Sequence, residues 1–315
     1  MRHSSFGSAL KLYWNLACEA GSRSACTSLI LAKALNIDPH SDISGSEIRE
    51  KLIDGGPSMG NQAERVALAR QLLGGSVCRK LAIYDIPADF ILSVVVPIFN
   101  EVDSLGQVIE AIRASGFRCE IILVDDGSTD GTRDLLESIK DQADLKVVLH
   151  AKNQGKGAAL RTGFQQATGD AVLIQDADLE YTPEDYPALL QPIILDGVDA
   201  VYGSRFVAGS RNVPRVRHYL ANKLVTWWSN LFTNLLLTDM ETCYKVFRRE
   251  VIQEIAPTLR ESRFGIEPEI TAKLARRKGL RIREVPIRYY PRSYEEGKKI
   301  GWRDGLWALW CSVRY

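Results

Sequence analysis

Hydrophobic residues recur with two different spacings along this chain, and the spacing changes near residue 90. Before that point, apolar residues recur at helical intervals over residues 6–36 and again over residues 61–73. A capping box at residues 44–47 marks the start of a further short helix between them. No candidate catalytic cluster accompanies these helices. We therefore predict a small helical N-terminal domain of unassigned role over residues 1–88.

After residue 90, apolar runs rich in β-branched residues alternate with segments of helical periodicity. Such runs are typical of strands that are buried on both faces of a parallel sheet. The four clearest runs span residues 91–96, 120–124, 146–149 and 171–174. Because these strands alternate with helices, we predict an α/β fold with a mainly parallel sheet and right-handed crossovers over residues 89–315.

Carboxylates and glycines follow three of these strands directly, in the loops at residues 97–101, 125–132 and 176–180. Since parallel strands end at one edge of a sheet, we expect the three loops to lie together, where α/β proteins bind ligands. Asp176 and Asp178 stand one residue apart, so they can share one side of the chain. Two such carboxylates suit a hard divalent cation with phosphate co-ligands, and a solvated acidic turn is the alternative.

Composition and charge exclude several classes of protein. The 315 residues include 40 Lys and Arg and 39 Asp and Glu, so the net charge of +1 provides no general field for nucleic acid. The six cysteines contain no CxxC pair, which indicates reduced thiols rather than a metal site. Neither an uninterrupted apolar window of about 18 residues nor a signal peptide is found, so we expect a cytoplasmic protein without a transmembrane helix.

Four motifs of the second region occur in the order typical of one enzyme family. They are residues 96–101 (VPIFNE), 124–132 (VDDGSTDGT), 153–159 (NQGKGAA) and 175–178 (QDAD). Through them the chain resembles the family 2 inverting glycosyltransferases, over roughly residues 91–305. The resemblance implies the GT-A fold of nucleotide-diphospho-sugar transferases, a three-layer α/β/α sandwich, and it leaves the N-terminal region without an assignment.

Four later motifs resemble the polyprenyl-phosphate (dolichyl-phosphate type) hexose synthases within that family. They are residues 203–206 (GSRF), 242–248 (TCYKVFR), 285–287 (VPI) and 292–298 (RSYEEGK). This resemblance implies a hexosyltransferase of the EC 2.4.1 type with Mg²⁺ or Mn²⁺ as cofactor. Such an enzyme moves a hexose from a nucleotide-diphosphate sugar (GDP-mannose or UDP-glucose) to a polyprenyl (dolichyl or undecaprenyl) phosphate. The metal would neutralise the leaving diphosphate as a Lewis acid.

Position by position, the same resemblance implies roles for individual side chains. The nucleotide-sugar pocket would be formed by Pro97, Phe99, Glu101, Val124, Asp126, Lys156, Asp176, Ala177 and Asp178, with Asp126 on the base. The metal ligands would be Asp176, Asp178 and Glu180, and the catalytic residues would be Asp176, Asp178, Arg205, Arg292 and Lys298. Phe99 stands where the family commonly has tyrosine, and Glu180 stands where some relatives have glutamine.

The chemistry of the acceptor decides whether a general base is needed. A lipid phosphate is already ionised near neutral pH and needs none, whereas a hydroxyl group of a glycan or small metabolite would need one. Glu267 or Glu269 could serve, although acids in a first helical turn are also favoured by the helix dipole. Asp239 has two possible interpretations in the same way, as a carboxylate of the site or as an ordinary turn residue. The alternative functions are a soluble family 2 transferase with a hydroxyl acceptor and a non-catalytic sugar-nucleotide binding module.

Two apolar segments that contain tryptophan suit a membrane surface. Residues 218–237 are too short and too polar to span a bilayer but fit an amphipathic helix at an interface. Residues 298–310 mix basic side chains with three tryptophans, which favour the headgroup level. We therefore expect peripheral contact with the cytoplasmic face of a membrane. Packing of both segments on the sheet, or on a partner subunit in a homo-oligomer, is the alternative.

Overall fold

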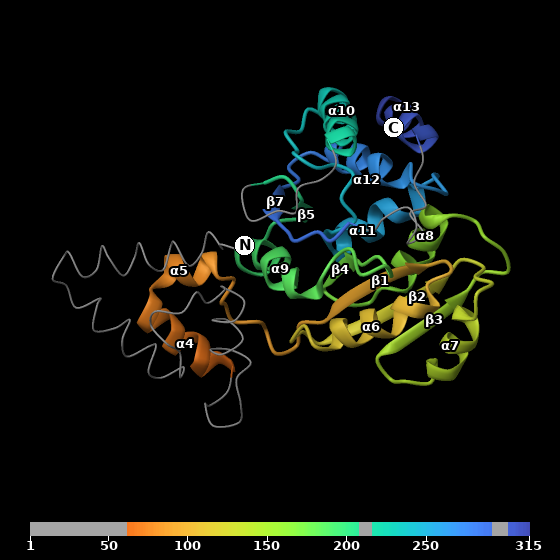
Figure 1. Cartoon of the computed structure of the whole chain (residues 1–315). Helices are drawn as coiled ribbons and strands as arrows, with labels where there is room; N and C mark the ends of the chain where they lie inside the picture. Colours follow the sequence, from red (N-terminus) through yellow and green to blue (C-terminus); the bar gives the residue numbers. More distant parts are fainter. Residues whose placement is uncertain (1–61, 208–215, 292–301) are drawn as a thin grey trace. The chain divides into compact units, whose positions relative to one another are not determined.

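The chain divides into two compact units, Met1–Pro87 and Ala88–Tyr315. The computed structural model describes part of each, namely residues 62–207, 216–291 and 302–315 (Figure 1). In the first unit, α4 (Gln62–Leu73) and α5 (Gly75–Lys80) are helical, and α4 agrees with the predicted third helix. The two earlier predicted helices lie outside the described residues. The assignment of residues 1–88 as a helical domain therefore stays a prediction.

The second unit is built on one sheet, whose seven strands within the described residues have the order β3-β2-β1-β4-β6-β5-β7 (Figure 1). In chain order the strands are β1 (Leu92–Ile98), β2 (Cys119–Asp125), β3 (Leu145–Leu149), β4 (Ala171–Ile174), β5 (Ala200–Ser204), β6 (Lys245–Arg248) and β7 (Ile282–Pro286). β6 runs antiparallel to both of its neighbours, and every other pairing is parallel. The predicted α/β fold with a mainly parallel sheet is confirmed, including all four predicted strands.

Crossover helices explain why the first strands are so apolar. α6 (Val102–Arg113) joins β1 to β2 and α7 (Thr132–Ile139) joins β2 to β3, whereas α8 (Lys156–Gln166) leads back across the sheet to β4. Because the crossovers are right-handed, α6 and α7 cover one face and α8 covers the other, which gives three layers (Figure 1). A strand covered on both faces needs apolar side chains throughout, and β4 is buried at every position.

The remaining helices belong to the part of the chain that follows β4. They are α9 (Tyr186–Asp196), α10 (Val216–Thr233), α11 (Arg249–Ile255), α12 (Ile266–Ala275) and α13 (Trp302–Arg314), with short 3₁₀ turns at Pro183–Asp185 and Ala256–Thr258. α10, α12 and α13 pack on one another (Figure 1). α10 confirms the predicted helix over most of residues 218–237, and α13 shows that the second apolar segment with tryptophan is helical from Trp302 on. Within the described ranges, no helix combines the length and the hydropathy needed to cross a bilayer.

Candidate active site

The loops that carry the predicted site residues lie at one edge of the sheet. The first five strands are parallel, so the segments that follow them leave at the same edge, and the antiparallel β6 brings the segment before Lys245 to it as well. β1 is flanked by β2 and β4, which makes the end of β1 the topological switch point. Ligands of open α/β sheets bind beside such a point. The convergence expected for the three carboxylate loops is therefore confirmed.

Two non-glycine residues with a left-handed backbone flank this switch point. Asn100, after β1, has a φ of 54°, and Leu179, after β4, has a φ of 58°. Asparagine tolerates this region, whereas leucine is strained there by about 1–2 kcal/mol. The Asn100 side chain accepts a hydrogen bond from the Thr129 N–H at 2.8 Å, and its own N–H donates to Ser128 Oγ at 2.9 Å. These bonds hold the loop after β1 against the loop after β2.

Asp126, directly after β2, is buried and anchors the loop that leads into α8. Its carboxylate accepts hydrogen bonds from the N–H groups of Gln154 and Gly155 at 2.9 and 2.6 Å. It also pairs with His150 Nδ1 at 2.7 Å. These bonds position the glycine-rich turn from which Lys156 projects. Contact between Asp126 and the base of a nucleotide stays a prediction.

Five residues predicted to line the nucleotide-sugar pocket lie at or just beyond the ends of β1, β2 and β4: Pro97, Phe99, Glu101, Val124 and Ala177. Pro97 pairs with Val124 in the sheet. Ser104 Oγ, in the first turn of α6, lies 2.7 Å from the Ala177 carbonyl oxygen and 3.0 Å from Glu101 Oε2. This hydroxyl therefore connects the loop after β1 to the loop after β4. The structure thus brings the five residues to one region of the sheet edge.

Lys156 forms an ion pair with Asp176, and its Nζ lies 2.7 Å from Asp176 Oδ1 and 3.5 Å from Glu267 Oε1. Glu267 also accepts a hydrogen bond from the fully buried Lys245. These four side chains form an alternating charge row, Asp176–Lys156–Glu267–Lys245. Burial by itself would lower the pKa of Lys156, but Asp176 and Glu267 raise this pKa well above its ordinary value. Lys156 is therefore a cation that neutralises Asp176.

Asp176 and Asp178 provide the hard oxygen donors that Mg²⁺ and Mn²⁺ prefer, and they fit an ion whose other ligands come from a diphosphate. The Glu180 N–H donates to Asp178 Oδ1 at 3.2 Å, and Glu180 Oε2 accepts a hydrogen bond from the Tyr289 hydroxyl at 3.0 Å. Within the described ranges, no group of three or more His, Cys, Asp or Glu side chains is arranged to hold a metal. The metal-ligand roles of Asp176, Asp178 and Glu180 therefore stay predictions.

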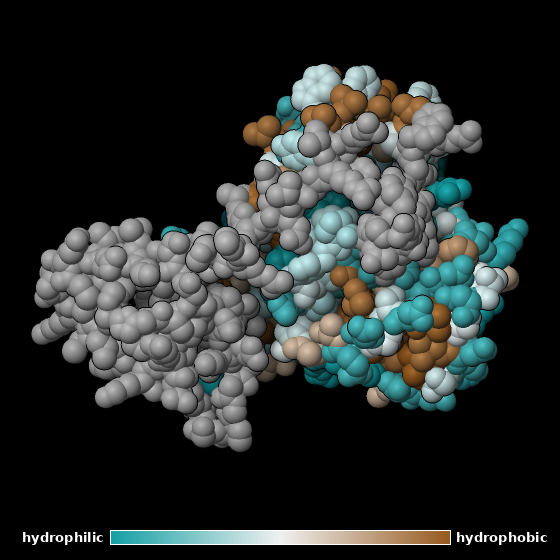
Figure 2. All heavy atoms as spheres, in the orientation of Figure 1, coloured by the Kyte–Doolittle hydropathy of each residue, from teal (hydrophilic) through white to brown (hydrophobic). Residues whose placement is uncertain are grey.

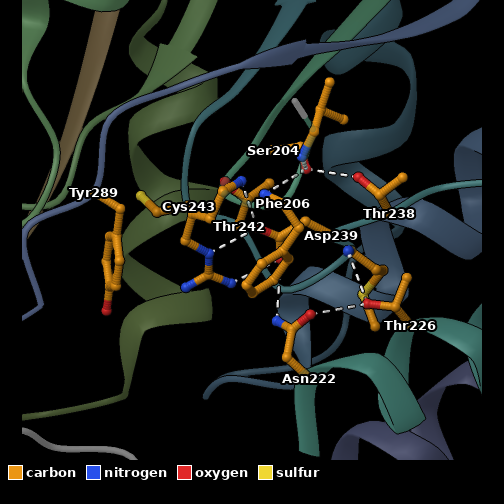
Figure 3. Close-up of polar contacts among 12 residues, drawn as sticks. Ser204, Phe206, Asn222, Thr226, Thr238, Asp239, Thr242, Cys243 and Tyr289 are labelled. Carbon is orange, nitrogen blue, oxygen red and sulfur yellow. Dashed lines mark hydrogen bonds and ion pairs between the residues drawn. The ribbon is translucent and has the colours of Figure 1, made fainter. Parts of the chain in front are cut away.

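Arg205, directly after β5, is held by Asp239 through two nitrogens on one edge of its guanidinium. Arg205 Nε and Nη2 each lie 2.7 Å from a carboxylate oxygen of Asp239, and Asn222 of α10 donates to the same carboxylate at 3.1 Å (Figure 3). The guanidinium carbon lies 5.0 Å from the ring centroid of Tyr289. Burial alone would raise the pKa of Asp239, but Arg205 lowers this pKa below its ordinary value. Asp239 is thus the buried partner of Arg205, and the Nη1 atom of Arg205 lies outside this pair. A contact of Arg205 with phosphate stays a prediction.

Glu269 has a structural role that sequence alone does not reveal. Its carboxylate accepts hydrogen bonds from the N–H groups of Arg260 and Glu261 at 2.8 and 2.7 Å and lies 2.7 Å from Lys273 Nζ. These contacts hold the loop before α12 against the helix. The interpretation of Glu269 as a general base is therefore wrong in this structure, because its lone pairs are occupied by donors of its own segment.

Sequence reasoning did not identify two charged groups of the site, Lys245 and Glu241. Lysine is normally solvated, so nothing in a local sequence signals that Lys245 is fully buried. Glu241 Oε1 is buried without a hydrogen-bond partner among the residues that the structure describes. Burial, together with the charge of Glu267, raises the pKa of Glu241 to about 7. Arg292 and Lys298 lie outside the described residues, so their predicted roles stay predictions.

The mainly parallel sheet, with carboxylates and cations gathered at its switch point, has the architecture of the GT-A glycosyltransferases. The chain belongs to glycosyl transferase family 2, whose family model matches residues 93–256. This assignment confirms the resemblance carried by the sequence motifs, and it makes the protein a glycosyltransferase.

Two named relatives and one solved structure illustrate the relationship. An undecaprenyl-phosphate mannosyltransferase of Micrococcus luteus is 30% identical over 239 residues, which cover 70% of this chain and 96% of the relative. A dolichol-phosphate mannosyltransferase of Pyrococcus furiosus is 29% identical over 67% of this chain and 59% of its own length. The crystal structure of glucosyl-3-phosphoglycerate synthase from Mycobacterium tuberculosis with Mn²⁺, UDP and phosphoglyceric acid superposes with a TM-score of 0.50. It is 23% identical over 66% of this chain and 74% of that chain, and it shares the fold.

The ion pair of Lys156 with Asp176 leads to a prediction about metal affinity. Replacing Lys156 with methionine removes the cation that neutralises Asp176, so Mn²⁺ should bind about 3- to 10-fold more tightly in the absence of nucleotide. Isothermal titration with Mn²⁺ measures this change directly. Lys152→Met, at an exposed lysine four residues earlier, is the matched control and should leave the affinity unchanged. Unchanged or weaker binding in Lys156→Met would contradict the role of Lys156 as a counter-ion.

Proposed function

We propose that this protein transfers a hexose, with inversion, from a nucleotide-diphosphate sugar to a polyprenyl phosphate. GDP-mannose and UDP-glucose are the candidate donors, and Mg²⁺ or Mn²⁺ is the cofactor. The enzyme works in peripheral contact with the membrane that holds its acceptor. The observation that carries the proposal is the placement of Asp176, Asp178 and Lys156 together at the sheet edge beside the switch point. The acceptor class is supported by the relatives that are named as polyprenyl-phosphate mannosyltransferases.

The residues at this edge fit the departure of a nucleoside diphosphate. A divalent ion bound there would act as a Lewis acid on the diphosphate as the anomeric bond breaks. Asp176 and Asp178 would hold that ion, and Lys156 would turn from Asp176 to the phosphate oxygens. Fixed cations that face a developing negative charge lower the barrier strongly, because they need no reorganisation during the reaction. Arg205 Nη1, which the Asp239 pair does not use, would serve the same task.

A phosphate acceptor also suits the state of the carboxylates near α12. An oxygen of the ionised phosphate attacks the anomeric carbon, the bond to the donor diphosphate breaks, and the diphosphate leaves with both bonding electrons, so no proton has to be removed. A hydroxyl acceptor would require a base, but Glu269 is held by its own loop and Glu267 accepts from Lys245 while facing Lys156. This arrangement favours the lipid phosphate over the soluble hydroxyl acceptor.

A transfer assay separates the two acceptor classes. The full-length protein is incubated with Mg²⁺ or Mn²⁺, with GDP-mannose or UDP-glucose, and with undecaprenyl phosphate, dolichyl phosphate or 3-phosphoglycerate. We expect sugar in the organic extract only when a lipid phosphate and a divalent ion are both present. Undecaprenol, which lacks the phosphate, is the matched control and should remain unglycosylated.

Two results would contradict the proposal in different ways. A water-soluble product formed from 3-phosphoglycerate, without glycolipid, would assign the enzyme to the transferases with a hydroxyl acceptor instead. Undiminished glycolipid formation after removal of divalent ions with EDTA would refute the metal-dependent mechanism while leaving the acceptor class in place.

A further inference from the structure

Glu241 lies in the segment between α10 and β6, which reaches the edge of the sheet where the candidate active site is formed. The chain is held on both sides of this residue. The Met240 N–H donates to Thr226 Oγ1 at 3.2 Å, and the Cys243 N–H donates to the Tyr181 hydroxyl at 3.3 Å. The backbone of Glu241 therefore has a fixed place in the site.

The carboxyl group of Glu241 is unusual in its surroundings. The exposed surface of the second unit includes apolar side chains of α10 and α13, while hydrophilic residues cover much of the rest and are solvated there (Figure 2). Glu241, by contrast, is partly buried, and its Oε1 is buried without a hydrogen-bond partner among the described residues. Thr242 Oγ1 is unpartnered in the same way. Buried polar atoms without partners are rare and cost stability, so they call for a functional explanation.

The carboxylates near Glu241 differ from it, because each has a cation of its own. Asp239 binds Arg205 through two nitrogens, and Glu267 accepts a hydrogen bond from Lys245. Burial and the charge of Glu267 raise the pKa of the Glu241 carboxyl group, whereas Lys245 and Arg205 lower it. Glu241 thus lies close enough to both ion pairs to respond to their charges, yet its Oε1 is bound by neither of them.

The position of Glu241 suits the sugar part of a nucleotide-sugar donor. Lys156 and Arg205 are the cations proposed to face the donor diphosphate, so the hexose bonded to this diphosphate must lie beside them. Glu241 is near both cations, because its neighbour Glu267 also faces Lys156, and Arg205 is itself a neighbour. An ionised diphosphate has no hydrogen-bond donor and is repelled by a carboxylate, whereas each hydroxyl group of a hexose can donate to one.

We propose that Glu241 Oε1 binds a hydroxyl group of the transferred hexose and thereby contributes to the choice of sugar. This role rests on the proposed function, in which the nucleotide sugar occupies this edge of the sheet. Because the chain on both sides of Glu241 is held, the oxygen cannot follow a hydroxyl group that points elsewhere. A hexose of the wrong configuration would leave the oxygen unpaired, and sites built in this way discriminate strongly between substrates.

A binding role for Glu241 has a consequence for stability that a structural role does not have. If Oε1 is paired only when the donor is bound, removal of the carboxyl group should not weaken the free protein. Glu241→Leu should therefore unfold at the same temperature as the parent or at a higher one, as is usual where a functional group is kept at the expense of stability. A carboxyl group that supports the fold would give a lower unfolding temperature when removed.

Calorimetric titration of the full-length protein tests the hexose contact without an acceptor. The probes, each with Mg²⁺, are UDP, UDP-glucose, GDP and GDP-mannose. Glu241→Leu should lose at least about 10-fold in affinity for the nucleotide sugar that the parent binds, and should bind the corresponding diphosphate like the parent. Glu241→Gln keeps an oxygen of the same reach and should retain most of the affinity. Glu110→Leu, which removes an exposed glutamate of α6, is the matched control and should leave all four affinities unchanged.

The outcomes separate the hexose contact from the proposed function. A loss of affinity limited to the nucleotide sugar, in a protein that glycosylates no lipid phosphate, would support the contact and refute the proposed acceptor. Glycolipid formation by Glu241→Leu with the parent rate and the parent KM for the donor would overturn the contact and leave the proposed function in place. Equal losses for the diphosphate and its sugar form would overturn it in favour of a nucleotide contact. A lower unfolding temperature with unchanged donor affinity would overturn it in favour of a structural role.

Discussion

Asparagine in place of Asp178 should lower the rate of hexose transfer at least about 100-fold while leaving the protein folded. In the proposed mechanism, the substitution removes one of the two negative charges that Asp176 and Asp178 would offer to a divalent ion just beyond the end of β4. Groups that act on charge developing in a transition state typically contribute factors of about 10²–10³. The fold should survive because the asparagine Oδ1 can still accept the hydrogen bond that the Glu180 N–H donates to Asp178.

Three measurements on this variant separate lost chemistry from lost structure. Steady-state kinetics at saturating donor give the change in rate, Mn²⁺ titration gives the change in metal affinity, and thermal unfolding reports stability. Asp141→Asn is the matched control, because Asp141 is an exposed acid in the turn before β3. A variant at Asp178 that keeps more than a tenth of the parent rate with unchanged Mn²⁺ affinity would show that Asp178 does not hold the ion.

Alanine in place of Asp239 should lower the free energy of unfolding by about 3–5 kcal/mol, which is the usual cost of leaving one partner of a buried ion pair alone. Asp239 is fully buried, and both of its oxygens bind the guanidinium of Arg205. Without the carboxylate, Arg205 keeps a charge in an apolar setting, and Asn222 loses an acceptor. Urea unfolding followed by tryptophan fluorescence measures the change.

A double variant isolates the pair itself. Arg205→Met/Asp239→Leu replaces both charges with apolar side chains of similar size, so it should recover at least about 2 kcal/mol relative to Asp239→Ala. A change below about 1 kcal/mol in Asp239→Ala, or a double variant less stable than that single variant, would mean that the pair does not support the fold. The hexose transfer rate of the double variant then reports what Arg205 contributes to chemistry, separately from stability.

The sheet was predictable because its cause is local. β1, β2 and β4 are covered on both faces for most of their length, so burial appears directly as apolar, largely β-branched runs of the chain. β3, at the edge of the sheet, is only partly buried, and its β-branched pair Val147 and Val148 still marks it. β6 was not predicted as a strand. It has only four residues, Lys245–Arg248, and a lysine at its start conceals the burial. Its place between β4 and β5, antiparallel to both strands, is a property of the whole sheet and not of its own residues.

Some residues of the candidate site could likewise be predicted from local sequence, and others could not. Asp176 and Asp178 could be identified beforehand, because a strand end with two carboxylates is a local pattern, and the family motifs added Lys156 and Arg205. The partners of these residues could not be identified. Asp176 and Glu267 are brought to the same lysine although they are 91 positions apart (267 − 176), and Asp239 reaches Arg205 across the loops before β6. Glu269 was interpreted as a possible base until its contacts with its own loop were known.

The sequence alone therefore determined the class of fold, the order of the motif loops and the acidic strand end at Asp176 and Asp178, because each depends on residues that are neighbours in the chain. Only the tertiary structure decided which charges neutralise one another and which apolar faces remain exposed on α10 and α13. Ion pairing and burial depend on distances between segments far apart in sequence, and the strand order of the sheet sets those distances.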